Sequence, residues 1–442
     1  MPPNILFLMS DEHRPDVTGY EGNRIIRTRV LDELARTGVV FRNAYTPSPI
    51  CIPGRQAMMS GQYPRTCGCE RFGQDLPPFS MTFARRFAQY AYTTVAAGKL
   101  HHLGPDQMQG WTQRIGSAIK VGDAHIGDRD EDAFQRYTRP TRAVKWSDAK
   151  EIKRAGIGRA GNVAEDEYAL QGTLQFIERY FNDPFYDREQ VNRPLLLKVS
   201  LNQPHYPYLT SAEKFNYYLN RVEPFLDQEV FDHPFLSMRQ VRPGVDASER
   251  EIRRATAAYY GMIETIDEMY GQVLRALEHV GQDLDDWIII YTSDHGEMLG
   301  EHGIWEKQKF FEASVRVPLI IRWPKGFPGG RTVCENVNLC DLFATLCDLA
   351  DIPTPDGLES RSLAPLLRNE PWPWPNETFS QFWGRNLMIK RDALKYHSYG
   401  EEWPEVLFDL ERDPGETTNF IDDPAYAEAV AAFRARRAEM GF

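Results

Sequence analysis

The sequence has few cysteines, no dense run of basic residues and no long apolar segment. Its six cysteines are spread over 442 residues without the regular spacing of a disulfide framework. The 51 Lys and Arg residues are outnumbered by 63 Asp and Glu residues, which gives a formal charge of -12. Because no cluster of basic residues is dense enough to neutralise a nucleic-acid backbone, we expect no nucleic-acid partner. An anionic ligand must instead be attracted by a local positive site.

Signals for export and for membrane insertion are missing as well. The chain begins Met1-Pro2-Pro3-Asn4 and runs directly into a short apolar segment, without the basic region and cleavage site of a signal peptide. No apolar run approaches the length of a membrane span. We therefore expect a cytoplasmic protein with no membrane partner.

Short apolar runs alternate with longer segments of helical periodicity, which indicates an α/β protein with a large, mostly parallel sheet flanked by helices. The candidate strands span residues 5–9, 93–97, 195–201, 287–292 and 317–321. The candidate helices span residues 30–36, 80–90 with Ser80 as the cap, and 248–280.

A proline-rich break at residues 371–375 marks a change of composition. Short strand-like pieces follow it, at residues 379–383 and 396–399, and then a helix at 425–440. We predict a large catalytic domain over residues 1–365 and a small C-terminal α+β domain over residues 366–442.

Polar side chains follow four of the predicted strands. They are Asp11 and Glu12; Lys99, His101 and His102; His205; and Asp294 and His295. In open α/β sheets ligands bind beyond the carboxyl ends of the strands, so we expect these side chains to converge. Asp11, Asp294 and His295 offer hard oxygen and nitrogen ligands that suit one divalent cation.

Cys51 begins the pentad Cys51-Ile52-Pro53-Gly54-Arg55, in which the proline suits the first turn of a helix. The pentad resembles the modification signature of the type I sulfatases. Residues 294–307 resemble the second signature of that family, residues 4–11 its opening strand and residues 98–102 its sulfate-binding turn. The chain therefore resembles the formylglycine-dependent sulfatases of the alkaline phosphatase superfamily. The Asp-His pair at 294–295 places it near choline sulfatases, iduronate sulfatases and phosphonate monoester hydrolases.

This resemblance implies an alkaline-phosphatase-like fold and a modified nucleophile. A formylglycine-generating enzyme would convert Cys51 to formylglycine, whose hydrate attacks the ester. One divalent metal would be bound by five residues, namely Asp11, Glu12, Cys51, Asp294 and His295. Calcium is favoured by the habit of the family, whereas the histidine ligand leaves manganese open, and magnesium is the third candidate.

The resemblance also implies roles for the basic side chains. Arg55 would hold the hydrate, and Lys99 and Lys307 would bracket the sulfate oxygens. His101 would be the base that triggers sulfate release, with His102 as a competing substrate-binding candidate. His205 would face the leaving group as general acid. We further expect His302 to support the metal loop and Lys309 to be exposed.

Several functions are compatible with this set of residues. The first is hydrolysis of a sulfate monoester of a small molecule or carbohydrate. The second is hydrolysis of a phosphonate monoester or phosphodiester at the same formylglycine, and the third is a non-catalytic anion-binding relative. Trp111 and Trp146 are available for the aromatic cage that a choline ester requires. The alcohol part of the substrate and the oligomeric state, including a homo-oligomer, stay open.

Overall fold

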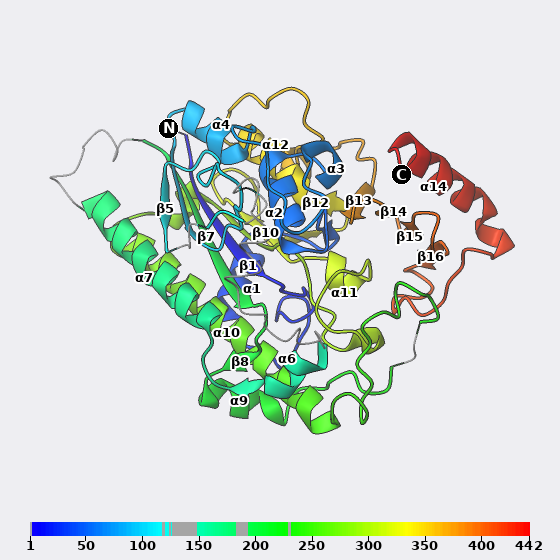
Figure 1. The fold of residues 1–442 in the computed structure, drawn as a ribbon. Coiled ribbons are helices and arrows are strands. Elements are labelled where there is room, and N and C mark those ends of the chain that lie inside the picture. Colours follow the sequence, from blue (N-terminus) through cyan, green and yellow to red (C-terminus); the bar gives the residue numbers. More distant parts are fainter. Residues whose placement is uncertain (1, 117–119, 123–124, 126–147, 183–192, 229–230) are drawn as a thin grey trace, which may run out of the picture.

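The computed structural model describes residues 2–116, 120–122, 125, 148–182, 193–228 and 231–442. Its centre is an eight-stranded sheet in the order β11-β2-β10-β9-β1-β7-β4-β5 (Figure 1). The strands are β1 (Asn4–Asp11), β2 (Val39–Phe41), β4 (Thr93–Gly98), β5 (Gln113–Ile115), β7 (Leu195–Pro204), β9 (Trp287–Ser293), β10 (Leu319–Arg322) and β11 (Arg331–Val333).

The sheet is mostly parallel, which confirms the predicted fold class. β1 pairs in parallel with β7 and β9, and β4 pairs in parallel with β7 and β5. β10 is antiparallel to both of its neighbours. The strand expected at 317–321 starts later, at Leu319, because the amide of Val317 donates to the carbonyl of Ala44 outside the sheet.

Helices cover both faces of the sheet (Figure 1). One face carries α1 (Arg29–Thr37), α7 (Gly161–Asn182) and α10 (Glu249–His279), and the other carries α2 (Cys51–Ser60), α4 (Phe83–Gln89) and α12 (Leu342–Leu349). Along β1, Ile5, Phe7 and Met9 enter the core under α2, α4 and α12, whereas Leu6 and Leu8 enter the core under α1, α7 and α10. Burial on both faces explains why this strand is an unbroken apolar run.

Two helix starts can be compared with the sequence predictions. The helix expected at 248–280 is α10, and Ser248 caps it through a capping box with Glu251. The expected Ser80 cap of the earlier helix is wrong. Thr82 caps α4 by accepting a hydrogen bond from the amide of Arg85, while the Ser80 hydroxyl donates to the carbonyl of Pro77.

The C-terminal region is a small α+β unit at one end of the molecule (Figure 1). Its antiparallel sheet consists of β13 (Glu377–Phe382), β14 (Asn386–Arg391), β15 (Leu394–Tyr399) and β16 (Val406–Asp409), and it is followed by α14 (Ala427–Glu439). The predicted boundary after residue 365 stays a prediction, and α13 (Ala364–Arg368) spans it.

The remaining elements are short. They are β3 (Ala44–Tyr45), α3 (Pro64–Cys67), α6 (Asp148–Arg154), β6 (Gly156–Ile157), β8 (Leu209–Thr210), α9 (Ala212–Leu219), α11 (Glu312–Val315) and β12 (Val337–Asn338). Among the described residues, no helix has both the length and the apolar character needed to cross a bilayer.

A buried charge cluster ties the small sheet to the large one. The ammonium of Lys395, on β15, lies 2.8 Å from a carboxylate oxygen of Glu312 and 2.8 Å from one of Glu416. Lys395 is fully buried, and Glu416 also accepts a hydrogen bond from the amide of Glu312. Glu312 begins α11, directly after the segment that carries Lys307, so the cluster links the small sheet to the neighbourhood of the polar strand ends.

Replacing Lys395 by methionine leaves the buried carboxylate of Glu416 without its cation and Glu312 with only Arg316 at 3.8 Å, so we expect a loss of about 3–5 kcal/mol in the free energy of unfolding. Urea denaturation and the melting temperature measure this loss. The matched control is Lys325→Met, because Lys325 pairs with Asp283 and Asp286 on the exposed surface, and its effect should be far smaller. Equal destabilisation by both variants would contradict the role of the buried cluster.

Candidate active site

Cys51 is the first residue of α2, as expected for a pentad that opens a helix. Its sulfur lies 3.1 Å from Nε2 of His295 and 3.7 Å from a carboxylate oxygen of Asp11, and the residue is 2% exposed. Burial and the nearby Asp11 carboxylate raise the pKa of the Cys51 thiol. The unmodified side chain is therefore a neutral thiol at neutral pH, and a neutral thiol is a poor nucleophile.

Arg55, one helical turn after Cys51, joins the strand ends. Its guanidinium donates to Asp294 at 2.7 Å and to Asp11 at 2.9 Å, and to the carbonyl of Lys99 and the hydroxyl of Ser200, both at 2.9 Å. The side chain is 1% exposed. This set of contacts fixes two carboxylates from adjacent strands against one cationic group.

Four buried side chains form a possible metal site. The ligand atoms of Asp11, Cys51, Asp294 and His295 all lie within 4.8 Å of one another. Nδ1 of His295 is 3.0 Å from the carbonyl of Gly296, so Nδ1 carries the hydrogen and the lone pair of Nε2 faces the cluster. Two carboxylates and an imidazole with its tautomer set in this way suit a divalent cation.

Glu12 lies beside this group and is completely buried. Its Oε2 accepts a hydrogen bond from the ammonium of Lys307 at 2.9 Å, whereas its Oε1 is buried without a hydrogen-bond partner. Burial raises the pKa of Glu12, and the ammonium of Lys307 only partly opposes this effect. A cation next to Oε1 would supply the missing partner, so the residues present fit the metal that the sequence predicts.

Two lysines remain charged in this buried region. The ammonium of Lys99 lies 2.8 Å from Asp11, and that of Lys307 lies 2.9 Å from Glu12. Burial lowers the pKa of both lysines, but the neighbouring carboxylates together have the larger effect, so the pKa of both is raised. The turn that delivers Lys99 depends on Gly98, which has a φ of +77° and whose added Cβ would lie 2.0 Å from the carbonyl oxygen of Ser200.

The structure separates the two adjacent histidines. His101 lines a cavity of about 450 Å³ together with Lys99, and its Nδ1 is buried without a hydrogen-bond partner. Burial lowers the pKa of His101, and Lys99 and Arg55 lower it further. His102 lines the same cavity, but its Nδ1 lies 3.0 Å from the carbonyl of Gln107. Burial lowers the pKa of His102 to about 3. Only His101 is brought next to the charged groups.

His205 directly follows β7 and lies beside Glu12 and Asp11. Its Nε2 lies 3.6 Å from Glu12 and 4.0 Å from Asp11. Nδ1 donates to the carbonyl of Tyr206 at 2.7 Å, so Nε2 is the atom that takes up or gives a proton toward the site. Burial lowers the pKa of His205, and Lys307 and Lys99 lower it further, while Asp11 opposes them.

The predictions for His302 and Lys309 have different outcomes. His302 is buried and its ring stacks on Phe311 with centroids 4.0 Å apart, and its support of the metal loop stays a prediction. The expectation that Lys309 is exposed is wrong. It is 4% exposed, and its ammonium lies 4.2 Å from the centroid of the Phe235 ring.

Asp166, on α7, organises the end of β7 and is not among the residues predicted from the sequence. Its carboxylate accepts hydrogen bonds from the backbone and side-chain nitrogens of Asn202, at 2.6 and 3.0 Å, and of Gln203, at 2.9 and 3.1 Å. Asn162, one turn earlier, donates to the carbonyl of His205 at 2.8 Å. In the sequence Asp166 sits in an acidic run that is typical of a solvated helix face, so no local signal marks it.

Comparison with known proteins identifies the family of this chain. A family model described as Sulfatase matches residues 3–352, and a model described as N-sulphoglucosamine sulphohydrolase, C-terminal, matches residues 300–440. The chain belongs to the sulfatase family. This sulfatase is a sulfuric ester hydrolase with the expected alkaline-phosphatase-like fold.

Individual relatives match almost the whole chain. A choline-sulfatase of Rhizobium meliloti (strain 1021) is 30% identical over 99% of this chain and 86% of its own length. An arylsulfatase of Clostridium perfringens (strain 13 / Type A) is 28% identical over 98% of this chain and 93% of its own. The crystal structure of a phosphonate monoester hydrolase of Agrobacterium radiobacter superposes with a TM-score of 0.79 at 22% identity, covering 99% of this chain and 95% of that one, which shows the shared fold.

Asp166→Ala should lower kcat of this sulfatase on an aryl sulfate by about 100-fold, because the β7 end that carries His205 loses its anchor. KM should change much less, and Asp166→Asn, which keeps one acceptor oxygen, should restore part of kcat. Steady-state kinetics and the melting temperature measure both effects. The control is Glu167→Ala, whose side chain is 44% exposed on the same helix. An unchanged kcat in Asp166→Ala, or a parallel loss in the control, would refute the positioning role.

Proposed function

We propose that this sulfatase hydrolyses a sulfate monoester by means of a formylglycine made from Cys51, beside one divalent cation. The observation that carries the proposal is the position of Cys51. Its sulfur stands at a helix start, 3.1 Å from His295 and 3.7 Å from Asp11, where two charged lysines also converge. An atom attached to the Cβ of residue 51 therefore faces both the metal ligands and the groups that would neutralise sulfate.

A modified residue at position 51 supplies an oxygen nucleophile where the sequence has a thiol. A formylglycine hydrate offers two hydroxyl groups on one carbon. The oxygen of the first forms a bond to sulfur while the bond between sulfur and the alcohol oxygen breaks. The second hydroxyl then loses its proton and rebuilds the carbonyl, which breaks the bond between carbon and the sulfate oxygen and releases sulfate.

The residues around Cys51 neutralise the charge of the ester, transfer protons and hold the metal. Lys99 and Lys307 neutralise the non-bridging oxygens of the ester as point charges. His205 faces the departing alcohol with its Nε2 as the general acid. His101, on the side of Lys99, accepts the proton of the second hydroxyl. A divalent cation, when bound, acts as a Lewis acid on the ester oxygens, with Asp11, Glu12, Asp294 and His295 as its protein ligands.

The metal and the substrate are proposed on different grounds. Calcium is preferred on the habit of the family, with manganese and magnesium as alternatives that the imidazole ligand permits. The substrate is a small-molecule or carbohydrate sulfate. Trp111 is buried with its ring against Phe83 and is not available for a choline cage, while Trp146 lies outside the described residues. A cytoplasmic location stays part of the proposal.

Protein produced together with a formylglycine-generating enzyme should carry an aldehyde at position 51, since the pentad there is intact. Mass spectrometry of the peptide that contains residue 51 detects the loss of sulfur and the gain of oxygen. Cys51→Ala should lower kcat on an aryl sulfate by at least about 1,000-fold. Full activity in a preparation whose residue 51 is entirely thiol would overturn the proposed nucleophile.

This enzyme should prefer 4-nitrophenyl sulfate to a 4-nitrophenyl phenylphosphonate ester by about 100-fold in kcat/KM. A phosphonate places a carbon substituent where sulfate has a third non-bridging oxygen, which leaves one of the charged donors in the site without its acceptor. Kinetics with both esters on one preparation, with the aldehyde content measured in parallel, decide the preference. A higher kcat/KM for the phosphonate would favour the phosphonate monoester hydrolase alternative.

A further inference from the structure

Tyr206 lies between two of the groups that the proposed reaction uses, although no step of that reaction uses its own side chain. The centroid of its ring is 4.1 Å from that of the neighbouring His205 ring, and the two planes are inclined by 36°. The ammonium of Lys307 lies over the same ring, 4.9 Å from its centroid. One aromatic side chain therefore contacts both the proposed general acid and a proposed sulfate-binding lysine.

The surroundings of Tyr206 restrict the orientation of its ring. Tyr206 packs against the buried group of side chains that includes Tyr208, and the centroids of these two rings are 6.3 Å apart with planes at 67°. Tyr208 is itself completely buried, and its hydroxyl donates to Glu297 at 3.0 Å. Edge-to-face contacts between aromatic rings favour one relative orientation. The Tyr206 ring is thus attached to a well-packed part of the fold.

His205 is attached to Tyr206 in two ways. Its Nδ1 donates to the backbone carbonyl of Tyr206 at 2.7 Å, which sets the tautomer of the imidazole. A single hydrogen bond still allows the imidazole to turn about the direction of that bond, and the stacked ring of Tyr206 limits this rotation. As a result Nε2 stays directed at the site, where it lies 3.6 Å from Glu12.

Lys307 reaches the site on a flexible four-carbon stem, so a single ion pair does not fix its ammonium. The ammonium lies 2.9 Å from Glu12, and the face of the Tyr206 ring adds a cation–π attraction. This attraction is strongest where water is excluded, and the side chain of Lys307 is only 4% exposed. Burial raises the pKa of the Tyr206 hydroxyl, so the side chain that Lys307 meets is a neutral ring.

We propose that Tyr206 is a positioning residue of this sulfatase. Its ring holds the imidazole of His205 toward the leaving group and the ammonium of Lys307 toward a sulfate oxygen. This inference rests on the roles proposed above for these two side chains, and it adds the residue that orients them. Because both contacts are made by an aromatic face, phenylalanine can take the place of Tyr206, whereas an aliphatic side chain cannot.

The test compares Tyr206→Leu and Tyr206→Phe on two aryl sulfates by steady-state kinetics, with the aldehyde content and melting temperature of each preparation measured in parallel. Phenolate is a poorer leaving group than 4-nitrophenolate, so phenyl sulfate depends more on a well-placed general acid. In Tyr206→Leu, kcat/KM should fall by about 100-fold for phenyl sulfate and by about 10-fold for 4-nitrophenyl sulfate. Tyr206→Phe should stay within about 3-fold of the parent on both esters.

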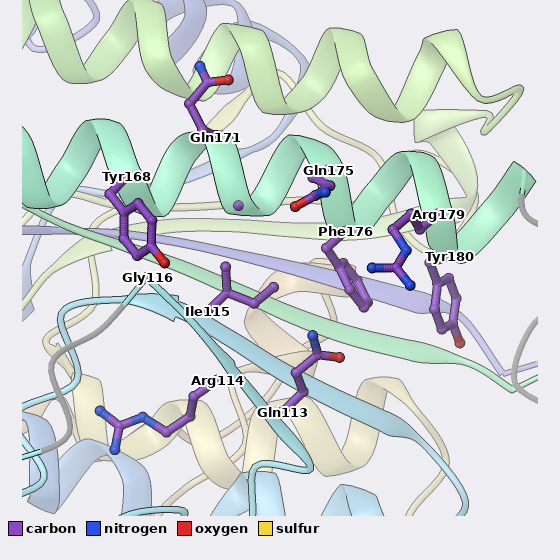
Figure 2. Close-up of a pocket in the computed structure, with 11 residues that line it drawn as sticks. Gln113, Arg114, Ile115, Gly116, Tyr168, Gln171, Gln175, Phe176, Arg179 and Tyr180 are labelled. Carbon is purple, nitrogen blue, oxygen red and sulfur yellow. The ribbon is translucent and has the colours of Figure 1, made fainter. Parts of the chain in front are cut away.

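The matched control is Tyr168→Leu, whose kinetics should equal those of the parent. Tyr168 is 71% exposed on α7 and lines a cavity of about 790 Å³ between β5 and α7, which none of the proposed catalytic groups lines (Figure 2). Tyr206→Met, which fills similar space without a ring, serves as the second ringless variant should Tyr206→Leu not fold.

Parent kinetics in Tyr206→Leu, equal losses on the two esters, or an equal loss in Tyr206→Phe would overturn the proposal. Failure of the proposed function is distinguishable from these outcomes, because it appears in the aldehyde-containing parent protein as an absence of activity on both esters.

Discussion

The site depends on one buried guanidinium. Arg55 binds carboxylates at the ends of β1 and β9, a hydroxyl on β7 and the carbonyl of the residue that follows β4, so one side chain contacts the ends of four neighbouring strands. Taking an arginine out of water is expensive, and the loss is offset because Asp11 and Asp294 both accept its hydrogen bonds. The same contacts hold these two carboxylates close together, so the fold itself prepares the metal site.

The rest of the charge around Arg55 follows from this arrangement. Two carboxylates engaged by an arginine can still keep Lys99 charged, and Glu12 does the same for Lys307. The pKa values of His101 and His205 shift in the opposite direction, because burial and the nearby cations lower them. A protein with a strong net negative charge therefore presents a local group of cations with two histidines beside them, which is the combination that attracts a sulfate ester.

The sequence predicts those parts of the site that are local. Polar residues after apolar runs indicate strand ends, and for this reason Asp11, Lys99, His205 and Asp294 can be identified from the order of residues alone. The selection of His101 over His102 is not local, since it depends on the left-handed backbone at Gly98 and at His101. Lys309 is buried by the fold of a segment that otherwise looks polar, and Asp166 becomes an anchor only because α7 packs against the end of β7. Tertiary packing decides these three cases, and no pattern in a single chain encodes it.

Helix α7 positions one end of the large sheet. Asn162 and Asp166 on this helix hold the end of β7 that carries His205. The helix is 22 residues long, and Ala169, Leu170 and Ile177 bury it in the core beside β7 and β4. Because these contacts come from one element that is itself packed on the sheet, the position of His205 is fixed by helix packing rather than by loop conformation.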